Sequence, residues 1–178
     1  MNPADKSQAD FRRVRLLVLD VDGVLTDGLI IWDSEGRETK QFHVGDGSAI
    51  KWLMRAGVTV AWLTGRSSAV VAKRAEELGV TEVVQGAKRK LPAFRTLLRR
   101  TGFRAEEVCY VGDDLPDIPV LKRAGVACTV ADAPEEVKAV CQVVTRAAGG
   151  RGAVREVAER ILRAQGAWKK LLRSYHRV

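Results

Sequence analysis

The apolar run Leu16–Leu19 and the acidic residues that follow it constrain the fold more than any other part of this chain. The run leads directly into Asp20-Val21-Asp22-Gly23. A short uninterrupted apolar segment is typical of a strand buried on both faces, as in a parallel sheet covered by helices. Ligands of such sheets bind outside the carboxyl ends of the strands. Asp20 and Asp22 therefore indicate a site that holds a divalent cation, although a turn with two solvated aspartates would give the same short pattern.

The length of the chain predicts one domain, and its cysteine content predicts reduced thiols without disulfides. A chain of 178 residues is long enough for one core and short for two. Cys109, Cys128 and Cys141 are widely spaced without a CxxC pair, which favours buried thiols over a zinc site. No apolar run approaches the roughly 20 residues that span a bilayer, and the polar start 1–10 lacks the apolar stretch of a signal peptide. We expect a cytoplasmic protein that does not bind membranes.

The formal net charge of +8 is concentrated late in the chain. No zinc finger, aromatic RNA-binding motif or basic heptad accompanies it, so we expect no nucleic-acid partner. A solvated basic face, or a positive potential that attracts a small anionic substrate, explains the charge equally well. The second explanation suits a phosphate site.

After the first strand, the pattern predicts one hairpin and then alternating helices and strands. The hairpin is expected from two short strands, 29–32 and 38–43, in an insertion at about 29–43. Helices are expected at 48–56, 67–78, 92–101, 115–124, 134–139 and 153–165, and strands at 58–63, 82–85, 108–111, 126–130 and 142–145. This alternation indicates an α/β fold with a doubly wound, mainly parallel sheet.

The expected domain organisation is a flexible N-terminus at 1–10, one domain at 11–165 and a basic C-terminal tail at 166–178. Trp168 and Tyr175 lie in that tail. Large aromatic side chains near a terminus indicate docking on the same domain or on another subunit, and a frayed tail is the alternative.

Three further strand ends carry polar residues. Thr64-Gly65-Arg66 follows the strand at 58–63, Gly112-Asp113-Asp114 with Asp117 follows 108–111, and Lys88 and Lys90 follow 82–85. Each group alone has an ordinary explanation as a turn, a helix cap or a solvated loop. Because the carboxyl ends of parallel strands meet at one edge, their joint placement predicts a single site.

The residue types at this edge are those that phosphoryl transfer requires. Asp20 can attack phosphorus and carry an aspartyl phosphate, while Asp22 can protonate the leaving oxygen and later activate water. Mg²⁺ held by Asp20, the Asp22 carbonyl and Asp113 would let this anionic nucleophile approach a phosphate.

The remaining polar groups have supporting functions in this hypothesis. The Thr64 hydroxyl, the Gly65 amide and a lysine donate to phosphate oxygens. Asp114 and Asp117 orient the water ligands of the metal or that lysine.

The motifs, in this order, resemble those of the haloacid dehalogenase superfamily. They are Asp20-Val21-Asp22-Gly23, Thr64-Gly65, Lys90 and Gly112-Asp113-Asp114-Leu115-Pro116-Asp117. More narrowly, the chain resembles the 3-deoxy-D-manno-octulosonate 8-phosphate phosphatases, which have almost no cap domain. The narrower resemblance covers Leu16 to Gln165 and includes the Gly45-Asp46-Gly47 loop, Ala131-Asp132-Ala133-Pro134 and the block from Gly149-Gly150-Arg151-Gly152 to Glu156.

This resemblance implies the function and the assembly. It selects Lys90 over Lys88, and it implies a Mg²⁺-dependent phosphatase acting on 3-deoxy-D-manno-octulosonate 8-phosphate in lipopolysaccharide biosynthesis. It also implies a homotetramer in which the 29–43 hairpins meet and a neighbour completes each active site. Arg66 is expected to bind the sugar acid carboxylate, where related nine-carbon phosphatases tend to carry Glu. Thr64 replaces the more common serine and keeps the hydroxyl.

Two alternatives stay open at this point. One is a phosphatase for a nine-carbon keto-sugar acid 9-phosphate, and the other is a non-catalytic oligomerisation module of the same family. The presence of the motif residues disfavours the non-catalytic module, because such a module has no physical need for these side chains. His43 and His176 have no part in the proposed chemistry.

Overall fold

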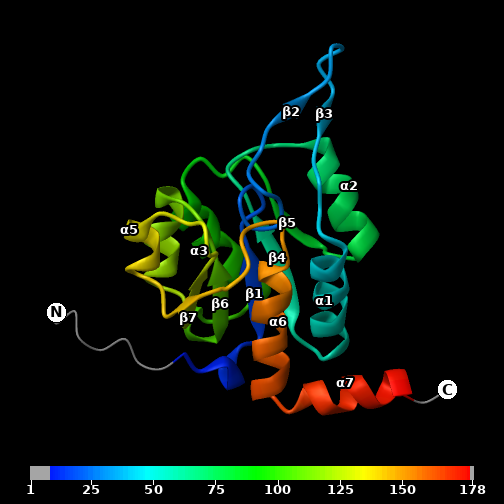
Figure 1. Ribbon diagram of the computed structural model, residues 1–178. Helices are drawn as coiled ribbons and strands as arrows, with labels where there is room; N and C mark the ends of the chain where they lie inside the picture. Colours follow the sequence, from blue (N-terminus) through cyan, green and yellow to red (C-terminus); the bar gives the residue numbers. More distant parts are fainter. Residues whose placement is uncertain (1–8, 177–178) are drawn as a thin grey trace.

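The fold is built around β1 (Leu16–Leu19), whose four side chains are completely buried. The computed structural model describes residues 9–176, so most of the N-terminal segment expected at 1–10 lies outside the described residues. A six-stranded sheet has the order β5-β4-β1-β6-β7-β8, and every neighbouring pair is parallel. This confirms the doubly wound, mainly parallel α/β fold, and residues 9–176 contain no large cap domain (Figure 1).

The strands of this sheet are short and apolar, and helices lie on both faces. Besides β1, the strands are β4 (Thr59–Leu63), β5 (Glu82–Val84), β6 (Val108–Val111), β7 (Val126–Thr129) and β8 (Val143–Val144). The helices are η1 (Phe11–Arg13), α1 (Val44–Arg55), α2 (Ala69–Leu78), α3 (Lys90–Thr101), η2 (Ala105–Glu107), η3 (Leu115–Asp117), α4 (Ile118–Leu121), α5 (Glu135–Lys138), α6 (Ala153–Ala164) and α7 (Ala167–His176). α1 packs against α2 and α6, and α3 packs against α4.

The strand order places a switch point next to β1. The chain runs from β1 outward through β4 to β5, then returns through α3 to β6 on the other side of β1. In an open α/β sheet, ligands bind where the strand order reverses, at the carboxyl ends. The loop after β1 therefore lies at the expected binding edge.

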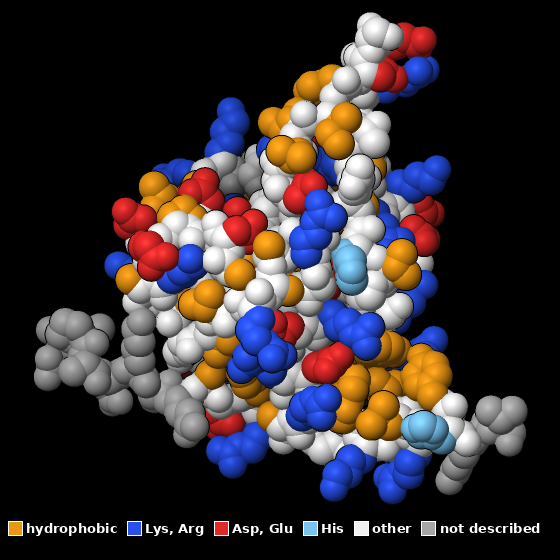
Figure 2. Space-filling model, viewed as in Figure 1, with side chains coloured by type: hydrophobic (Ala, Val, Ile, Leu, Met, Phe, Trp, Pro, Cys, Tyr) orange, Lys and Arg blue, Asp and Glu red, His pale blue; other side chains and the backbone are white. Residues whose placement is uncertain are grey.

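The insertion after β1 is a hairpin that projects from the domain (Figure 1). Its strands, β2 (Ile31–Trp32) and β3 (Glu38–Thr39), pair antiparallel and are shorter than expected. Leu29, Ile30 and Trp32 are exposed, and Figure 2 shows apolar side chains along this projection. A two-stranded ribbon without a covering layer gains little from longer pairing, which accounts for the short strands.

α1 begins at Val44, four residues before the expected start. The two glycines around Asp46 predicted a loop, but both are part of the helix. Asp46 is buried, and its Oδ1 accepts a hydrogen bond of 2.7 Å from the backbone N–H of Arg155 in the first turn of α6. Asp46 thus supplies the capping oxygen that Gly152, the N-cap residue of α6, cannot provide.

The segment expected as a basic tail forms α7, which docks on its own domain. Trp168 and Tyr175 both make edge-to-face contacts with Trp52 of α1, at ring centroid distances of 6.0 and 6.4 Å. The Trp52 indole N–H donates to the Tyr175 hydroxyl at 3.0 Å. Docking on the same domain is one of the three outcomes left open by the sequence, beside docking on another subunit and a frayed tail.

The helix expected at 115–124 is divided into η3 and α4, because Pro116 and Pro119 interrupt the regular hydrogen-bond ladder. Cys109 and Cys128 are buried on neighbouring strands, with 3.6 Å between their sulfur atoms. Among residues 9–176, no helix has the length and apolar character that a bilayer crossing requires.

Candidate active site

A cleft of about 340 Å³ lies at the carboxyl edge of the sheet, above the loop after β1. Its walls include most of the residues that the sequence motifs single out: Asp20, Asp22, Thr64, Gly65, Arg66, Lys88, Lys90, Asp113 and Asp114. The fold therefore brings residues from four strand ends to one place, as the pattern of strand ends predicted. Asp117 lies beneath this cleft and is completely buried.

Lys90 is the cation at the floor of the cleft. Its Nζ donates to Asp20 Oδ2 at 2.5 Å and to Asp117 Oδ1 at 2.6 Å. The Tyr110 hydroxyl also donates to Asp117 Oδ1, at 2.5 Å, and the backbone N–H groups of Asp113 and Asp114 reach Asp117 Oδ2, both at 3.2 Å. Asp117 is thus fully engaged in holding Lys90 and the loop after β6. Lys88, in contrast, is exposed.

Burial is the largest single influence on the ionisation of Asp20, Asp113 and Lys90, and neighbouring charges act with it or against it. Burial and the charge of Asp117 raise the pKa of Asp20 to about 6, against the opposing effect of Lys90. Burial and the charges of Asp20 and Asp117 raise the pKa of Asp113 to about 8. Burial alone would lower the pKa of Lys90, but the two carboxylates it contacts raise it above its ordinary value. One lysine does not balance three carboxylates.

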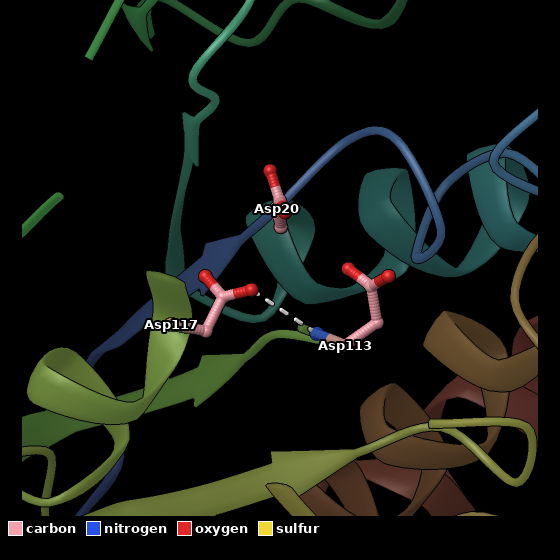
Figure 3. A group of neighbouring side chains, drawn as sticks. All are labelled: Asp20, Asp113 and Asp117. Atoms are coloured by element: carbon pink, nitrogen blue, oxygen red, sulfur yellow. Dashed lines mark hydrogen bonds between the residues drawn. The ribbon is translucent and has the colours of Figure 1, made fainter. Parts of the chain in front are cut away.

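The acidic residues fit a divalent cation. Asp20, Asp113 and Asp117 each offer a carboxylate oxygen, and these oxygens lie within 4.8 Å of one another (Figure 3). Among the described residues, none donates a hydrogen bond to the buried Oδ1 of Asp113. A hard cation with oxygen ligands would satisfy this atom and offset the excess negative charge. Since Asp117 is engaged by Lys90 and Tyr110, Asp20 and Asp113 are the carboxylates best placed to hold Mg²⁺.

The loop after β1 is shaped so that Asp113 can approach it. Gly23 has a positive φ of 88°, and a Cβ at this position would lie 2.0 Å from Asp113 Oδ2. Only glycine permits both this backbone conformation and this approach. The motif glycine therefore has a direct steric function at the candidate metal site.

The Asp22 side chain points to a different set of partners. Lys40, at the base of the hairpin, donates a short hydrogen bond from Nζ to Asp22 Oδ1. Arg66 Nε lies 3.8 Å from Asp22 Oδ2, and Arg66 Nη2 donates to Glu38 Oε1 at 3.1 Å. The expected metal contact of Asp22 involves its backbone carbonyl, so this side-chain direction is compatible with it.

Four residues of this site were not predicted from the sequence: Glu38, Lys40, Ser68 and Tyr110. Glu38 lies in β3 and Lys40 follows directly after it; the neighbouring Thr39 and Gln41 are exposed, whereas Lys40 is buried. The sequence carries no local signal for the burial of Lys40, because its hydrogen-bond partner Asp22 lies in the separate loop after β1. Tyr110 lies inside the apolar strand β6, where its sequence context gives no indication of a site.

The remaining expected residues lie at the cleft with less defined partners. Thr64 is buried, and its hydroxyl accepts a weak 3.4 Å contact from the backbone N–H of Arg66. Asp114 caps η3 by accepting from the N–H of Leu115 at 2.8 Å. His43 lies 3.8 Å from Asp46, outside the cleft, and His176 ends α7.

Comparison with known proteins agrees with this geometry. Residues 32–125 match the haloacid dehalogenase-like hydrolase family. The chain is 47% identical over 158 residues to the 3-deoxy-D-manno-octulosonate 8-phosphate phosphatase KdsC of Escherichia coli K12, covering 89% of this chain and 84% of that protein. It is 46% identical over 153 residues to KdsC of Salmonella typhi, covering 86% and 81%.

Solved structures show the same similarity. The 3-deoxy-D-manno-octulosonate 8-phosphate phosphatase of Moraxella catarrhalis, in complex with a magnesium ion, a phosphate ion and KDO, superposes with a TM-score of 0.91 at 42% identity, covering 93% of this chain and 95% of that one. The cobalt-bound enzyme of Haemophilus influenzae gives 0.86 at 41% identity, covering 88% and 92%. The chain therefore belongs to the haloacid dehalogenase-like hydrolases and, within them, to the 3-deoxy-D-manno-octulosonate 8-phosphate phosphatase family.

Proposed function

We propose that this chain is a Mg²⁺-dependent phosphomonoesterase that hydrolyses 3-deoxy-D-manno-octulosonate 8-phosphate to 3-deoxy-D-manno-octulosonate and phosphate, a reaction of lipopolysaccharide biosynthesis. The observation that carries the proposal is the Asp20 carboxylate at the cleft floor, bonded to Lys90 and beside Asp113. Relatives with this named activity cover most of the chain at 47% identity. The magnesium-bound relative of known structure supports the choice of metal.

In the proposed reaction, Asp20 and Asp22 divide the chemistry between them. An Asp20 oxygen attacks phosphorus, the bond between phosphorus and the sugar oxygen breaks, and Asp22 gives its proton to that oxygen. Asp22 then takes a proton from water as the water attacks the aspartyl phosphate, which releases phosphate and restores Asp20. Bound Mg²⁺, held by Asp20, Asp113 and the Asp22 carbonyl, supplies charge neutralisation between the nucleophile and the phosphate.

Donors around the cleft complete the phosphate site. Lys90, the Thr64 hydroxyl and the Gly65 amide stabilise charge on the transferring phosphoryl oxygens. Asp117 positions Lys90 through their 2.6 Å hydrogen bond, and Asp114 ends the loop that presents Asp113. Arg66 binds the carboxylate of the sugar acid, since a guanidinium offers paired donors to a carboxylate.

We also propose the finer organisation of the protein in the cell. The domain at 11–165 acts as one catalytic unit in the cytoplasm, and four copies assemble through their 29–43 hairpins so that a neighbour covers each cleft. The exposed Leu29, Ile30 and Trp32 on the projecting hairpin support this assembly. A cleft without its own cap domain needs such cover to exclude water.

The test of the function is phosphate release from the eight-carbon sugar acid 8-phosphate, compared with the nine-carbon 9-phosphate and simple hexose phosphates. Each substrate is assayed with Mg²⁺ and with a chelator. We expect strong preference for the eight-carbon substrate, loss of activity with the chelator, and loss of turnover in Asp20→Asn with the fold retained.

Each alternative predicts a different pattern in the same assay. Preference for the nine-carbon ester would identify that phosphatase instead. Weak and equal activity on every ester would contradict the substrate assignment while leaving the phosphatase chemistry. No activity with any ester would favour the non-catalytic module, and substantial activity of Asp20→Asn would refute Asp20 as nucleophile.

A further inference from the structure

Two residues at the base of the hairpin, Glu38 and Lys40, form a closed ring of alternating charges with Asp22 and Arg66. Lys40 Nζ donates to Asp22 Oδ1 and lies 3.4 Å from Glu38 Oε1. Arg66 Nη2 donates to the same Glu38 oxygen at 3.1 Å, and Arg66 Nε lies 3.8 Å from Asp22 Oδ2. We propose that Glu38 and Lys40 are positioning residues for the reaction, with Lys40 fixing Asp22 and Glu38 fixing Arg66.

The burial of Lys40 shows that the ring is part of the built site. Its side chain is 1% exposed, compared with 11% for Glu38 and 21% for Asp22. An ammonium that is removed from water must be compensated by nearby carboxylates, because an isolated buried charge is very costly. The two carboxylates of the ring provide that compensation, and the whole ring is formally neutral.

Lys40 restricts where the Asp22 carboxylate can point. A carboxylate on a loop rotates freely unless a donor holds it, and proton transfer requires hydrogen-bond distance to the reacting oxygen. Lys40 holds Oδ1 from the hairpin side, so Oδ2 is the oxygen left toward Arg66 and the cleft. The hairpin thereby fixes the orientation of the group that gives and takes the proton.

Glu38 has the same effect on Arg66. It is itself anchored by the Ser68 hydroxyl, which donates to Oε2, and it engages one amino group of the guanidinium. A guanidinium has five N–H donors, so this contact leaves others for a substrate carboxylate. Without Glu38, the nearby Asp22 carboxylate would attract Arg66 and the two groups would neutralise each other.

This inference rests on the proposed function for the roles of Asp22 and Arg66, and the experiment separates the two. We would measure kcat and KM for the eight-carbon sugar acid 8-phosphate and for para-nitrophenyl phosphate, which lacks the carboxylate. The variants are Lys40→Met, Glu38→Gln, Asp22→Asn and the double variant Lys40→Met/Asp22→Asn. Arg37→Met is the matched control, because Arg37 is a hairpin cation paired with Asp33 and Glu35 near the exposed tip.

We expect Lys40→Met to lower kcat about tenfold to a hundredfold on both substrates, with KM changed less than about twofold. In the Asp22→Asn background the same change should have almost no further effect, because its target is already lost. Glu38→Gln should raise KM about tenfold for the sugar acid only. Arg37→Met should behave as wild type.

The proposal is overturned for Lys40 if Lys40→Met lowers kcat by the same factor in the Asp22→Asn background as in wild type. A purely structural loss would give that result. It is overturned for Glu38 if KM rises equally for both substrates, and for both residues if Arg37→Met causes the same losses. If Lys40→Met does not fold, Glu38→Gln/Lys40→Met removes one charge of each sign and must still show the lower kcat and the raised sugar-acid KM.

Failure of the proposed function gives a different result. In that case wild type hydrolyses para-nitrophenyl phosphate but not the sugar acid phosphate. The Lys40 and Asp22 comparison on para-nitrophenyl phosphate then still decides the Lys40 assignment, since water activation by Asp22 is needed for either ester.

Discussion

At the scale of single residues, Lys90 is the cation that compensates the buried negative charge of Asp20 and Asp117 at the floor of the cleft. Its Nζ donates hydrogen bonds to Asp20 at 2.5 Å and to Asp117 at 2.6 Å, and its side chain is only 6% exposed. Breaking a buried ion pair by removing one partner costs about 3–5 kcal/mol, because the other charge is left without compensation. Here one cation serves two carboxylates, so its removal should be felt in both stability and activity.

Lys90→Met should abolish measurable turnover and lower the free energy of unfolding by about 3 kcal/mol in metal-free protein. Added Mg²⁺ should recover part of that stability but none of the activity, since the cation compensates charge without donating to the phosphate. Urea unfolding with and without Mg²⁺ checks this, with Lys88→Met as the comparison. A metal-free Lys90→Met protein as stable as wild type would contradict the account.

The sequence predicted the residues of this site unevenly. Lys90 was selected over Lys88 only through the resemblance to the family. Asp20, Thr64 and Asp113 were predicted because each lies at or near a strand end, where the alternating pattern makes spatial position a consequence of order. Lys40 was not, because its place depends on how the hairpin folds back over the loop after β1. No local pattern encodes that approach.

At the scale of elements, the loop at Gly149 and Gly150 supports the loop after β1, which carries Asp20 and Asp22. Gly150 N–H donates to the Val24 carbonyl at 2.9 Å, and Gly149 N–H donates to Asp132 at 3.0 Å. A Cβ on Gly149 would lie 1.9 Å from the Gly23 carbonyl oxygen. The two loops are thus in direct backbone contact, and a side chain at 149 would force them apart.

Gly149→Ala should displace the loop that carries Asp20 and Asp22, lowering kcat by about tenfold or more and weakening Mg²⁺ binding. Gly57→Ala is the control, because Gly57 has a positive φ of 88° with open space around its Cβ position, so it tests backbone strain alone. It should lose stability by about 1 kcal/mol and keep its kcat. Steady-state kinetics and Mg²⁺ titration of both variants measure the difference, and unchanged kinetics in Gly149→Ala would exclude this support.

The bounds of the strands in the sheet were predicted well, whereas the elements whose start or type depends on tertiary contacts were predicted less well. β1 and β6 have the expected bounds because their apolar runs are delimited by charged or glycine residues. α1 starts early because Asp46 inside it caps α6, and α7 is helical because Trp52 provides a surface for its aromatic residues. Both causes lie far away in the sequence, so neither was visible in the local pattern.

At the scale of the whole molecule, the projecting hairpin leaves apolar surface that one domain does not cover. Leu29, Ile30 and Trp32 are 62%, 54% and 57% exposed. Exposed apolar groups gathered on one projection are typical of an interaction surface. They are the basis of the proposed assembly.

Light scattering after gel filtration should give the mass of four chains of 19.5 kDa. Trp32→Glu should shift the protein to smaller species, because it places a charge in the proposed contact. The variant should also lose activity at low protein concentration, if a neighbour completes each cleft. A wild-type protein that stays monomeric at micromolar concentration would refute the assembly.

The stability of the whole molecule should depend on pH and Mg²⁺ together. The folded-state pKa of Asp113 is about 8 and that of Asp20 about 6, both above the ordinary value of 3.8. A carboxyl with a raised folded-state pKa favours the folded state while protonated. That contribution is complete below about pH 4 and is lost as the pH rises to about 6 for Asp20 and about 8 for Asp113.

Metal-free protein should therefore lose stability between pH 4 and pH 8, whereas Mg²⁺ should offset this loss because it binds the ionised carboxylates. If Mg²⁺ binding displaces one proton, the stabilisation by Mg²⁺ increases by at most about 2.7 kcal/mol between pH 6 and pH 8. The Mg²⁺-induced rise in Tm should therefore be up to roughly 5–10 °C larger at pH 8 than at pH 6. Thermal unfolding at both pH values measures it. Asp113→Asn should abolish most of the difference, since the amide neither titrates nor offers the same ligand charge. An equal Mg²⁺ effect at the two pH values in wild type would show that binding releases no proton from this cluster.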